Sequence, residues 1–173
     1  MMFRSAIIAS AAIFAMSTTA VAADAPTDPQ IAHIAYTAGS LDVAAGKQAL
    51  AKSHNKAVRA FAEEMVRDHA AVNDKALALV KKLKVTPEDN PTSQSLKKDA
   101  DDKMAQYAKL SGAAFDKAYA DNEVAYHKTV NGALESTLIP SAQNPELKSL
   151  LETGLKIFQG HQQHAEQLAG SLK

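Results

Sequence analysis

The sequence predicts an all-α protein, an antiparallel four-helix bundle with an additional connecting helix between the second and third long helices. Beyond the N-terminal segment, apolar residues recur at spacings of three and four, as on one face of a helix. Ala, Lys, Leu, Gln and Glu dominate the composition, and runs of β-branched residues are missing. Polar caps followed by prolines divide the chain into segments of about 25 residues, each about 38 Å long as a helix.

The first segment predicts a secretory signal peptide over residues 1–23. Arg4 precedes the apolar run "AIIASAAIFAM", and the small residues of "TTAVAADAP" follow, with cleavage expected after Ala22 or Ala23. The apolar run is shorter than the roughly 20 residues that span a bilayer, which disfavours a retained anchor. We therefore expect export, most simply to the periplasm, and a single bundle domain over residues 24–173 without an integral membrane segment. Association with the outer membrane stays open.

Charge and cysteine content exclude several classes of protein. The chain has 19 Lys plus Arg against 19 Asp plus Glu, so no basic face for nucleic acid is expected. Cysteine is absent, which excludes disulfides, thiolate metal ligands and a lipoprotein anchor. We expect packing alone to stabilise the bundle.

The first two long helices are predicted from their caps. Asp28 is the expected cap of the first, with Pro29 at its first helical position, and this helix runs to about Ser53. Asn55 is the expected cap of the second helix, which continues to about Lys84. Two glycines within the first helix, Gly39 and Gly46, indicate close approach of a neighbouring helix.

The remaining helices follow the loop "VTPEDNPTS". The charged stretch "SQSLKKDADDKMAQYAKL" predicts the connecting helix, on the outside of the bundle. Ser111 is the expected cap of the third long helix, which runs to near Ile139, where Pro140 should end it. Asn144 and Pro145 then repeat the cap-then-proline pattern and begin the fourth.

A polar residue interrupts the apolar face of each long helix. In "MVRDHAAVN", His69 occupies a position on the apolar stripe of the second helix. His127 and His161 do the same in the third and fourth helices, and Asp42 lies on the edge of the first. His33, near a helix start, and His54, in a turn, are interpreted as solvated.

These residues are also predicted to lie at one depth. Asp42 is 12 residues before His54 and His69 is 15 residues after it, which places them about 18 and 22 Å from that turn. His127 and His161 lie about 22–24 Å from the turn that joins the third and fourth helices. Three imidazoles and one carboxylate meeting at one level suit a tetrahedral zinc ion.

The alternative is a buried polar layer without metal. Uncoordinated imidazoles would cost roughly 1–3 kcal/mol each unless their ring nitrogens found partners, which favours the metal. Asp68, beside His69, and Glu123, one turn before His127, are candidates to accept imidazole hydrogen bonds. His164 is an alternative or fifth ligand.

Two further polar residues, Asp116 and Tyr119, lie two to three turns from His127 and are expected to form an internal hydrogen-bond pair. They belong to another layer of the bundle and not to the predicted metal site.

Zinc leads on ligand type, and other metals fit less well. A di-iron bundle would carry two Glu-x-x-His pairs, and no acidic residue stands three places before any histidine. Soft copper(I) ligands are scarce, while copper(II) on imidazoles stays an alternative. No nucleophile–base pair occurs at recognisable spacing, so no catalytic residue is assigned. If a water molecule took the place of Asp42 as the fourth ligand, the metal could activate that water.

Several stretches resemble one known family. "GSLDVAAGKQAL", "VRAFAEEMVRDH", "LSGAAFDKAYADNEVAYH" and "GHQQHAEQL" are similar to an exported bacterial domain of unknown function, whose members are commonly labelled membrane or outer-membrane proteins and grouped with ferritin-like bundles. The resemblance implies a helical bundle in the bacterial envelope with recurrent polar residues at Asp42, His69, Asp116, His127 and His161. The family usually has glutamate at the position of Asp42 and proline at that of Lys156.

The resulting hypothesis is an exported bundle that binds one zinc ion through Asp42, His69, His127 and His161. Stability, metal handling and stress tolerance are the roles it could serve. The alternative is a non-catalytic interaction or stress-tolerance bundle whose metal-free polar layer fixes helix register.

Overall fold

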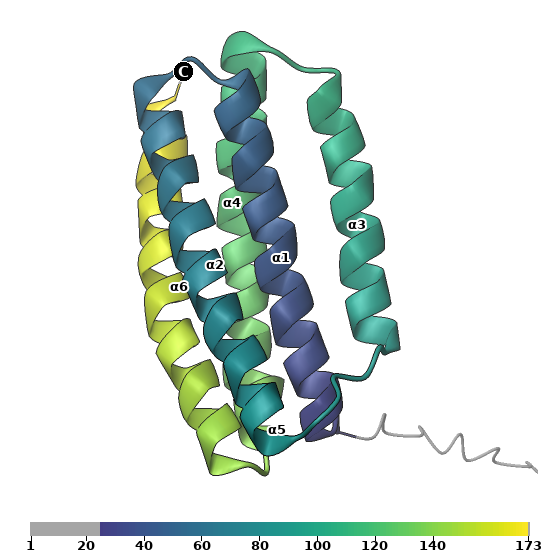
Figure 1. Cartoon of the computed structure of the whole chain (residues 1–173). Coiled ribbons are helices and arrows are strands. Elements are labelled where there is room, and N and C mark those ends of the chain that lie inside the picture. The colour runs from purple at the N-terminus through teal and green to yellow at the C-terminus, as the bar shows by residue number, and fades with distance from the viewer. Residues whose placement is uncertain (1–24, 173) are drawn as a thin grey trace, which may run out of the picture.

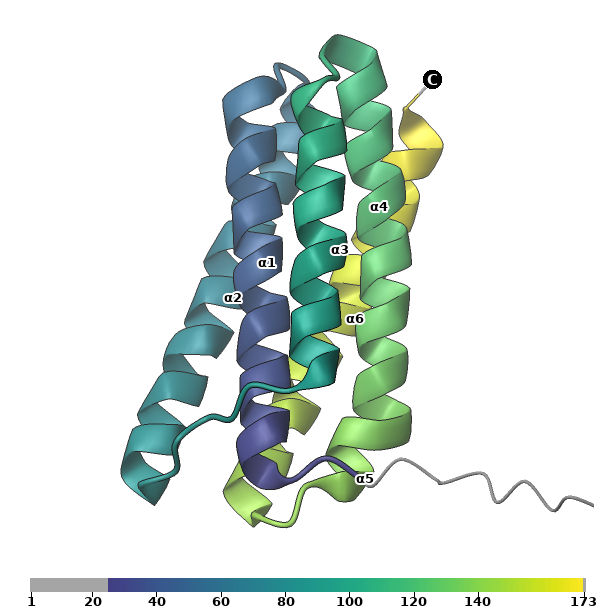
Figure 2. The ribbon, with the colours of Figure 1, turned by 90° about the vertical axis from the view of Figure 1, so that its right-hand side faces the viewer.

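A computed structural model describes residues 25–172, and the predicted signal peptide, residues 1–23, lies outside this range. Four long helices form a bundle in which neighbouring helices run antiparallel (Figure 1). They are α1 (Asp28–Lys52), α2 (Lys56–Leu83), α4 (Gly112–Ala133) and α6 (Pro145–Ser171). A shorter helix, α3 (Pro91–Ala108), lies outside the bundle over α1 and α4 (Figure 2). Residues 25–172 contain no strand, so the predicted all-α bundle with a connecting helix is confirmed.

Two of the predicted helix caps form as expected. Asn55 Oδ1 accepts the N–H groups of Ala57 and Val58, at 2.9 and 3.3 Å, and begins α2. Asn144 accepts equivalent bonds at the start of α6. Ser111 stands at the cap position of α4, but its side chain makes no capping hydrogen bond.

The predicted cap of α1 is wrong by one residue. Thr27 is the cap, and its N–H donates to Gln30 Oε1 at 3.1 Å. Asp28 is already helical, and its carboxylate points across to the start of α6, where it accepts the N–H groups of Gln143 and Asn144, each at 2.8 Å. A contact between residues this far apart in the chain decided which residue caps the helix.

The expected end of the third long helix at Pro140 is also wrong. The helix continues through a wider turn, the π-helix η1 (Leu134–Leu138), and then α5 (Ile139–Ser141). The N–H of Ile139 donates to Leu134 O, five residues back. Pro140 is thereby near the start of a new helical turn, where the missing N–H of a proline is tolerated.

The core consists of two apolar clusters at opposite ends of the bundle. The aromatic cluster lies near the α1–α2 turn and includes Phe61, Tyr107, Phe115 and Tyr119. The aliphatic cluster lies near the α5–α6 turn and consists of Ile31, Ile34, Leu134, Leu138, Ala142, Leu147, Leu151 and Phe158. In the view of Figure 2, α2 slants away from α4 toward its C-terminal end.

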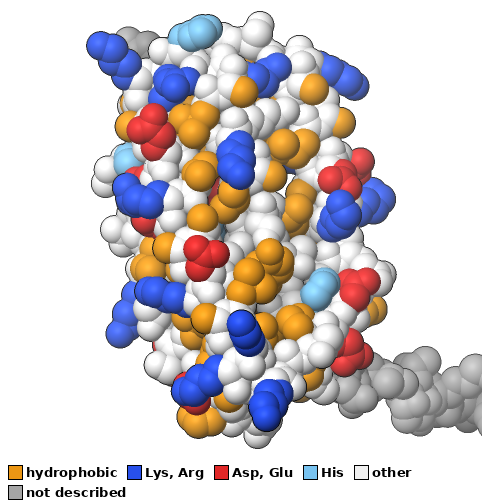
Figure 3. All heavy atoms as spheres, viewed as in Figure 1, with side chains coloured by type: hydrophobic (Ala, Val, Ile, Leu, Met, Phe, Trp, Pro, Cys, Tyr) orange, Lys and Arg blue, Asp and Glu red, His pale blue; other side chains and the backbone are white. Residues whose placement is uncertain are grey.

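The surface carries both signs of charge. Figure 3 shows acidic and basic side chains interspersed over the face that includes α1, α2 and α3. Several are paired along one helix, as in Lys98–Asp102 at 2.8 Å and Lys117–Asp121 at 2.5 Å. Within residues 25–172, none of the helices has the length and hydrophobicity needed to cross a bilayer.

Candidate metal centre

Four polar side chains, one from each long helix, meet between the two apolar clusters. Asp42, His69, His127 and His161 are at most 2% exposed. One ring nitrogen from each of the three histidines lies within 4.8 Å of the others. Asp42 Oδ2 lies 2.9 Å from His69 Nε2 and 3.5 Å from His127 Nε2. The predicted convergence is confirmed, while coordination of a metal by these residues stays a prediction.

Close packing of α1 against α2 brings Asp42 and His69 together. A Cβ on Gly46 would lie 2.9 Å from Val66 Cγ2 and 3.1 Å from Ala62 O, so only glycine allows this approach without a shift of α2. At Gly39 the nearest atoms belong to the end of the Asn73 side chain, which can move. The predicted close approach of a neighbouring helix is therefore confirmed at Gly46.

Aromatic packing fixes the orientation of the His69 ring. The Phe158 ring stacks on it with a centroid distance of 4.4 Å and an angle of 5° between the planes. The ring therefore turns its edge, which carries the nitrogens, toward its polar neighbours.

In each of His127 and His161, one ring nitrogen makes a hydrogen bond and the other ring nitrogen makes none. His127 Nδ1 donates to the backbone oxygen of Glu123 at 2.9 Å, and His161 Nε2 donates to Asp68 Oδ2 at 3.1 Å. His127 Nε2 and His161 Nδ1 are then buried lone pairs without a hydrogen-bond partner. Both nitrogens of His69 and both oxygens of Asp42 also lack a well-directed hydrogen bond, although His69 Nε2 and Asp42 Oδ2 are 2.9 Å apart. Unpaired buried polar atoms are costly, so their concentration at one point indicates a site.

Burial sets the charge of these groups. Burial lowers the pKa of His127 to about 4 and also lowers the pKa of His161, so both imidazoles are neutral at neutral pH. Burial acts to raise the pKa of Asp42, but the facing His69 and His127 outweigh it and the pKa is lowered. Neutral imidazoles beside a carboxylate are the protonation states in which these groups bind metals.

The Glu123 carboxyl lies beside Asp42 and His127 but differs from Asp42 in its protonation state. Burial, and then the negative charge of Asp42, raise the pKa of Glu123 well above its ordinary value, so the carboxyl is protonated. Its Oε2 lies 3.6 Å from His127 Nδ1. Asp42, Glu123 and His127 offer ligand atoms that are also within 4.8 Å of one another. Sequence reasoning placed Glu123 near the site, through its position one turn before His127, but not in contact distance of Asp42.

The predicted supporting residues make other contacts than expected. Asp68 pairs with His161 and not with its chain neighbour His69, because successive helical residues point about 100° apart. The backbone oxygen of Glu123, and not its carboxyl, accepts the bond from His127. His164 donates to Glu64 Oε2 at 2.7 Å and is outside the group of three imidazoles.

Two predictions for residues outside the site are wrong. Asp116 does not pair with Tyr119, because Asp116 Oδ1 accepts the Ser53 hydroxyl at 2.5 Å. The Tyr119 hydroxyl has no hydrogen-bond partner. His33, interpreted as solvated, is half-buried, and its Nδ1 lies 2.9 Å from the hydroxyl oxygen of Ser93.

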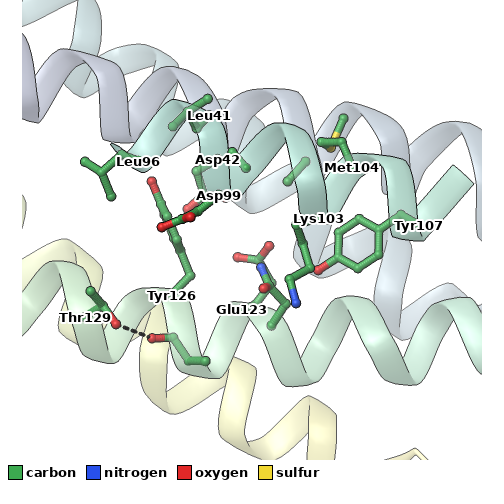
Figure 4. A pocket seen from close by; sticks show the side chains of 14 residues that line it. Leu41, Asp42, Leu96, Asp99, Lys103, Met104, Tyr107, Glu123, Tyr126 and Thr129 are labelled. Atoms are coloured by element: carbon green, nitrogen blue, oxygen red, sulfur yellow. Dashed lines mark hydrogen bonds between the residues drawn. The ribbon is translucent and has the colours of Figure 1, made fainter. Parts of the chain in front are cut away.

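A pocket reaches the acidic side of the site from beneath α3. Its volume is about 230 Å³, and its lining includes Asp42 and Glu123. Figure 4 shows these two carboxyl groups among the lining residues, together with Asp99 and Lys103 of α3. The pocket therefore ends beside Asp42, although the Asp42 side chain itself is 0% exposed.

Comparison with known proteins identifies the family of the chain. No curated protein and no solved structure gives a significant match. Residues 14–168, which include every residue of the candidate site, match the family described as "Domain of unknown function (DUF4142)". The resemblance to a domain of unknown function is thereby confirmed. With most of its length matched, the chain belongs to the DUF4142 family.

Proposed function

We propose that this protein binds one zinc ion through His69 Nε2, His127 Nε2, His161 Nδ1 and an Asp42 oxygen. The observation that carries the proposal is the set of buried, unpartnered ligand atoms, supplied by four helices at one level. A tetrahedral ion with bonds of about 2.0–2.1 Å needs its ligands about 3.3 Å apart. The distances from Asp42 Oδ2 to His69 Nε2 and His127 Nε2, 2.9 and 3.5 Å, bracket that value.

The donor set favours zinc over other ions. Three imidazoles and one carboxylate are ligands that zinc accepts in four-coordinate sites, and no thiolate is available in the chain. Copper(II) is the next candidate, because imidazole also suits it. The hydrogen bonds from His127 to Glu123 O and from His161 to Asp68 would orient both rings and strengthen them as ligands.

The setting of this site suits metal handling or stability and not hydrolysis. With Asp42 bound, four protein ligands close the coordination shell. The pocket under α3 borders Asp42 and is the side from which we expect an ion to enter. We also propose export to the periplasm, supported by the signal pattern of residues 1–23, and a ferritin-like origin of the bundle, supported by the helix order.

Metal analysis and titration test the proposal. The purified protein is stripped with a chelator and titrated with Zn²⁺ by calorimetry and with Co²⁺ as a spectroscopic probe. We expect one equivalent of either ion, the visible absorption of tetrahedral Co²⁺, and loss of binding in His127→Ala. Zinc at 100 times its Kd should stabilise the fold by about 2.7 kcal/mol.

His164→Ala is the matched control, because this histidine follows His161 by one turn but pairs with Glu64. It should keep the full equivalent of zinc. Protein that takes up no zinc and melts at the same temperature with zinc or chelator would overturn the proposal. The polar layer would then fix helix register without metal.

A further inference from the structure

A large apolar cavity occupies the aliphatic half of the bundle. Its volume is about 850 Å³, within the range of about 300–1,000 Å³ typical of small-molecule sites. α1, α2, α4, η1 and α6 all contribute to its walls. Most of the apolar side chains that line it are aliphatic, among them Ile34, Val72, Leu79, Leu134, Leu147 and Leu151.

Uncharged polar side chains border the cavity at both ends. Along α1 the lining runs from Thr27 to Gly39, 12 residues or about 18 Å. Gln30, Asn90 and Thr92 lie at the outer end, and the inner end holds His69 and Phe158 together with Asn73 and Tyr126. Among residues 25–172, no Lys, Arg, Asp or Glu lines this cavity.

These walls select for a neutral, elongated, apolar ligand. Aliphatic side chains offer water few hydrogen bonds, whereas an alkyl chain gains about 0.8 kcal/mol for each methylene removed from water, or about fourfold in affinity. A carboxylate or ammonium ion inside the cavity would lose its hydration with no opposite charge to replace it. The uncharged rim suits a hydroxyl or similar neutral head group.

We propose that this cavity is a binding site for a neutral molecule with a single long alkyl chain, its head at the rim and its chain end near Phe158. The proposal goes beyond zinc binding and does not depend on it, because the cavity is formed by apolar residues of every long helix. His69 is the one residue common to the cavity and the metal centre.

A series of straight-chain 1-alkanols of increasing length tests this proposal. Binding to the purified protein is measured by calorimetry below the solubility limit of each alcohol, in chelator and again with zinc. We expect affinity to rise about fourfold per methylene and then to level off once the chain fills the cavity. Alkyl carboxylates and alkylammonium ions of equal length should bind at least about tenfold more weakly.

Variants locate the site. Ala76 lines the cavity, whereas Ala78, two residues along α2, is exposed and does not. Ala76→Trp should weaken 1-decanol binding at least about tenfold, and Ala78→Trp should leave it unchanged. Ala133→Phe fills the cavity from α4 and serves if Ala76→Trp fails to fold by circular dichroism.

The outcomes separate this proposal from zinc binding. Binding of the alkanol series in chelator supports the cavity whether or not the protein takes up zinc. Affinity that does not change with chain length, equal binding of the charged analogues, or unchanged binding in every folded cavity-filling variant would overturn it.

Discussion

The two halves of the bundle use the same four helices but fill the space between them differently. In the aromatic half, Phe61, Tyr107, Phe115 and Tyr119 are at most 1% exposed, and their rings contact one another edge-on or stacked. In the aliphatic half, smaller side chains surround a cavity of about 850 Å³. Close packing is the rule in protein interiors, so the comparison separates a half built for stability from a half that has space for a ligand.

The buried polar layer lies at the boundary between these halves. Met65 of the aromatic cluster precedes His69 by one turn, and Phe158 of the aliphatic cluster stacks on its ring. The site thus rests on a rigid half and faces the cavity on the other side. The difference between the halves can be tested by substitution and by pH.

The largest expected effect is loss of an aromatic ring from the packed half. Phe115→Ala should lower the free energy of unfolding by about 3–5 kcal/mol, because its neighbours cannot collapse into the space left behind. Leu151→Ala, at the cavity wall, should cost only about 2 kcal/mol, since part of that side chain already borders open space. Urea denaturation measures both, and equal losses would contradict the comparison.

The next effect concerns pH and the polar layer. The lowered pKa values of His127 and His161 mean that the unfolded chain binds protons more readily, so stability falls as pH falls from 6.5 toward 4. The raised pKa of Glu123 acts oppositely, because the folded protein retains a proton that the unfolded chain loses above pH 4.5.

Glu123→Gln removes the opposing contribution and keeps the shape of the protonated side chain. As pH falls toward 4.5, the metal-free variant should therefore lose stability more steeply than the unmodified protein. Denaturation in chelator at a series of pH values measures this. Parallel pH profiles would mean that Glu123 is ionised in the folded protein.

The smallest expected change in stability comes from enlarging one alanine to leucine in each half. Ala120 is 0% exposed in the aromatic half, so Ala120→Leu should overpack it and cost about 1–3 kcal/mol. Ala76→Leu adds the same group to the cavity and should stabilise the protein by about 0.5–2 kcal/mol. Thermal unfolding gives both signs, and destabilisation by Ala76→Leu would show that the aliphatic half has no usable space.

Local patterns predicted the helices and most of their ends. Asn55 and Asn144 cap helices as expected, because capping needs only the next two or three residues. The depth of Asp42, His69, His127 and His161 was also predictable, since a helix rises by a constant distance per residue.

The sequence by itself determined the four helices and the level at which their polar residues meet. Only the tertiary structure decided the partners: Asp28 with the start of α6, Asp116 with Ser53, and Asp68 with His161. It also decided the cavity and the π-turn before Pro140. These depend on how far each helix is rotated and tilted against its neighbours. Rotation and tilt follow from packing between distant parts of the chain, which no local pattern of residues encodes.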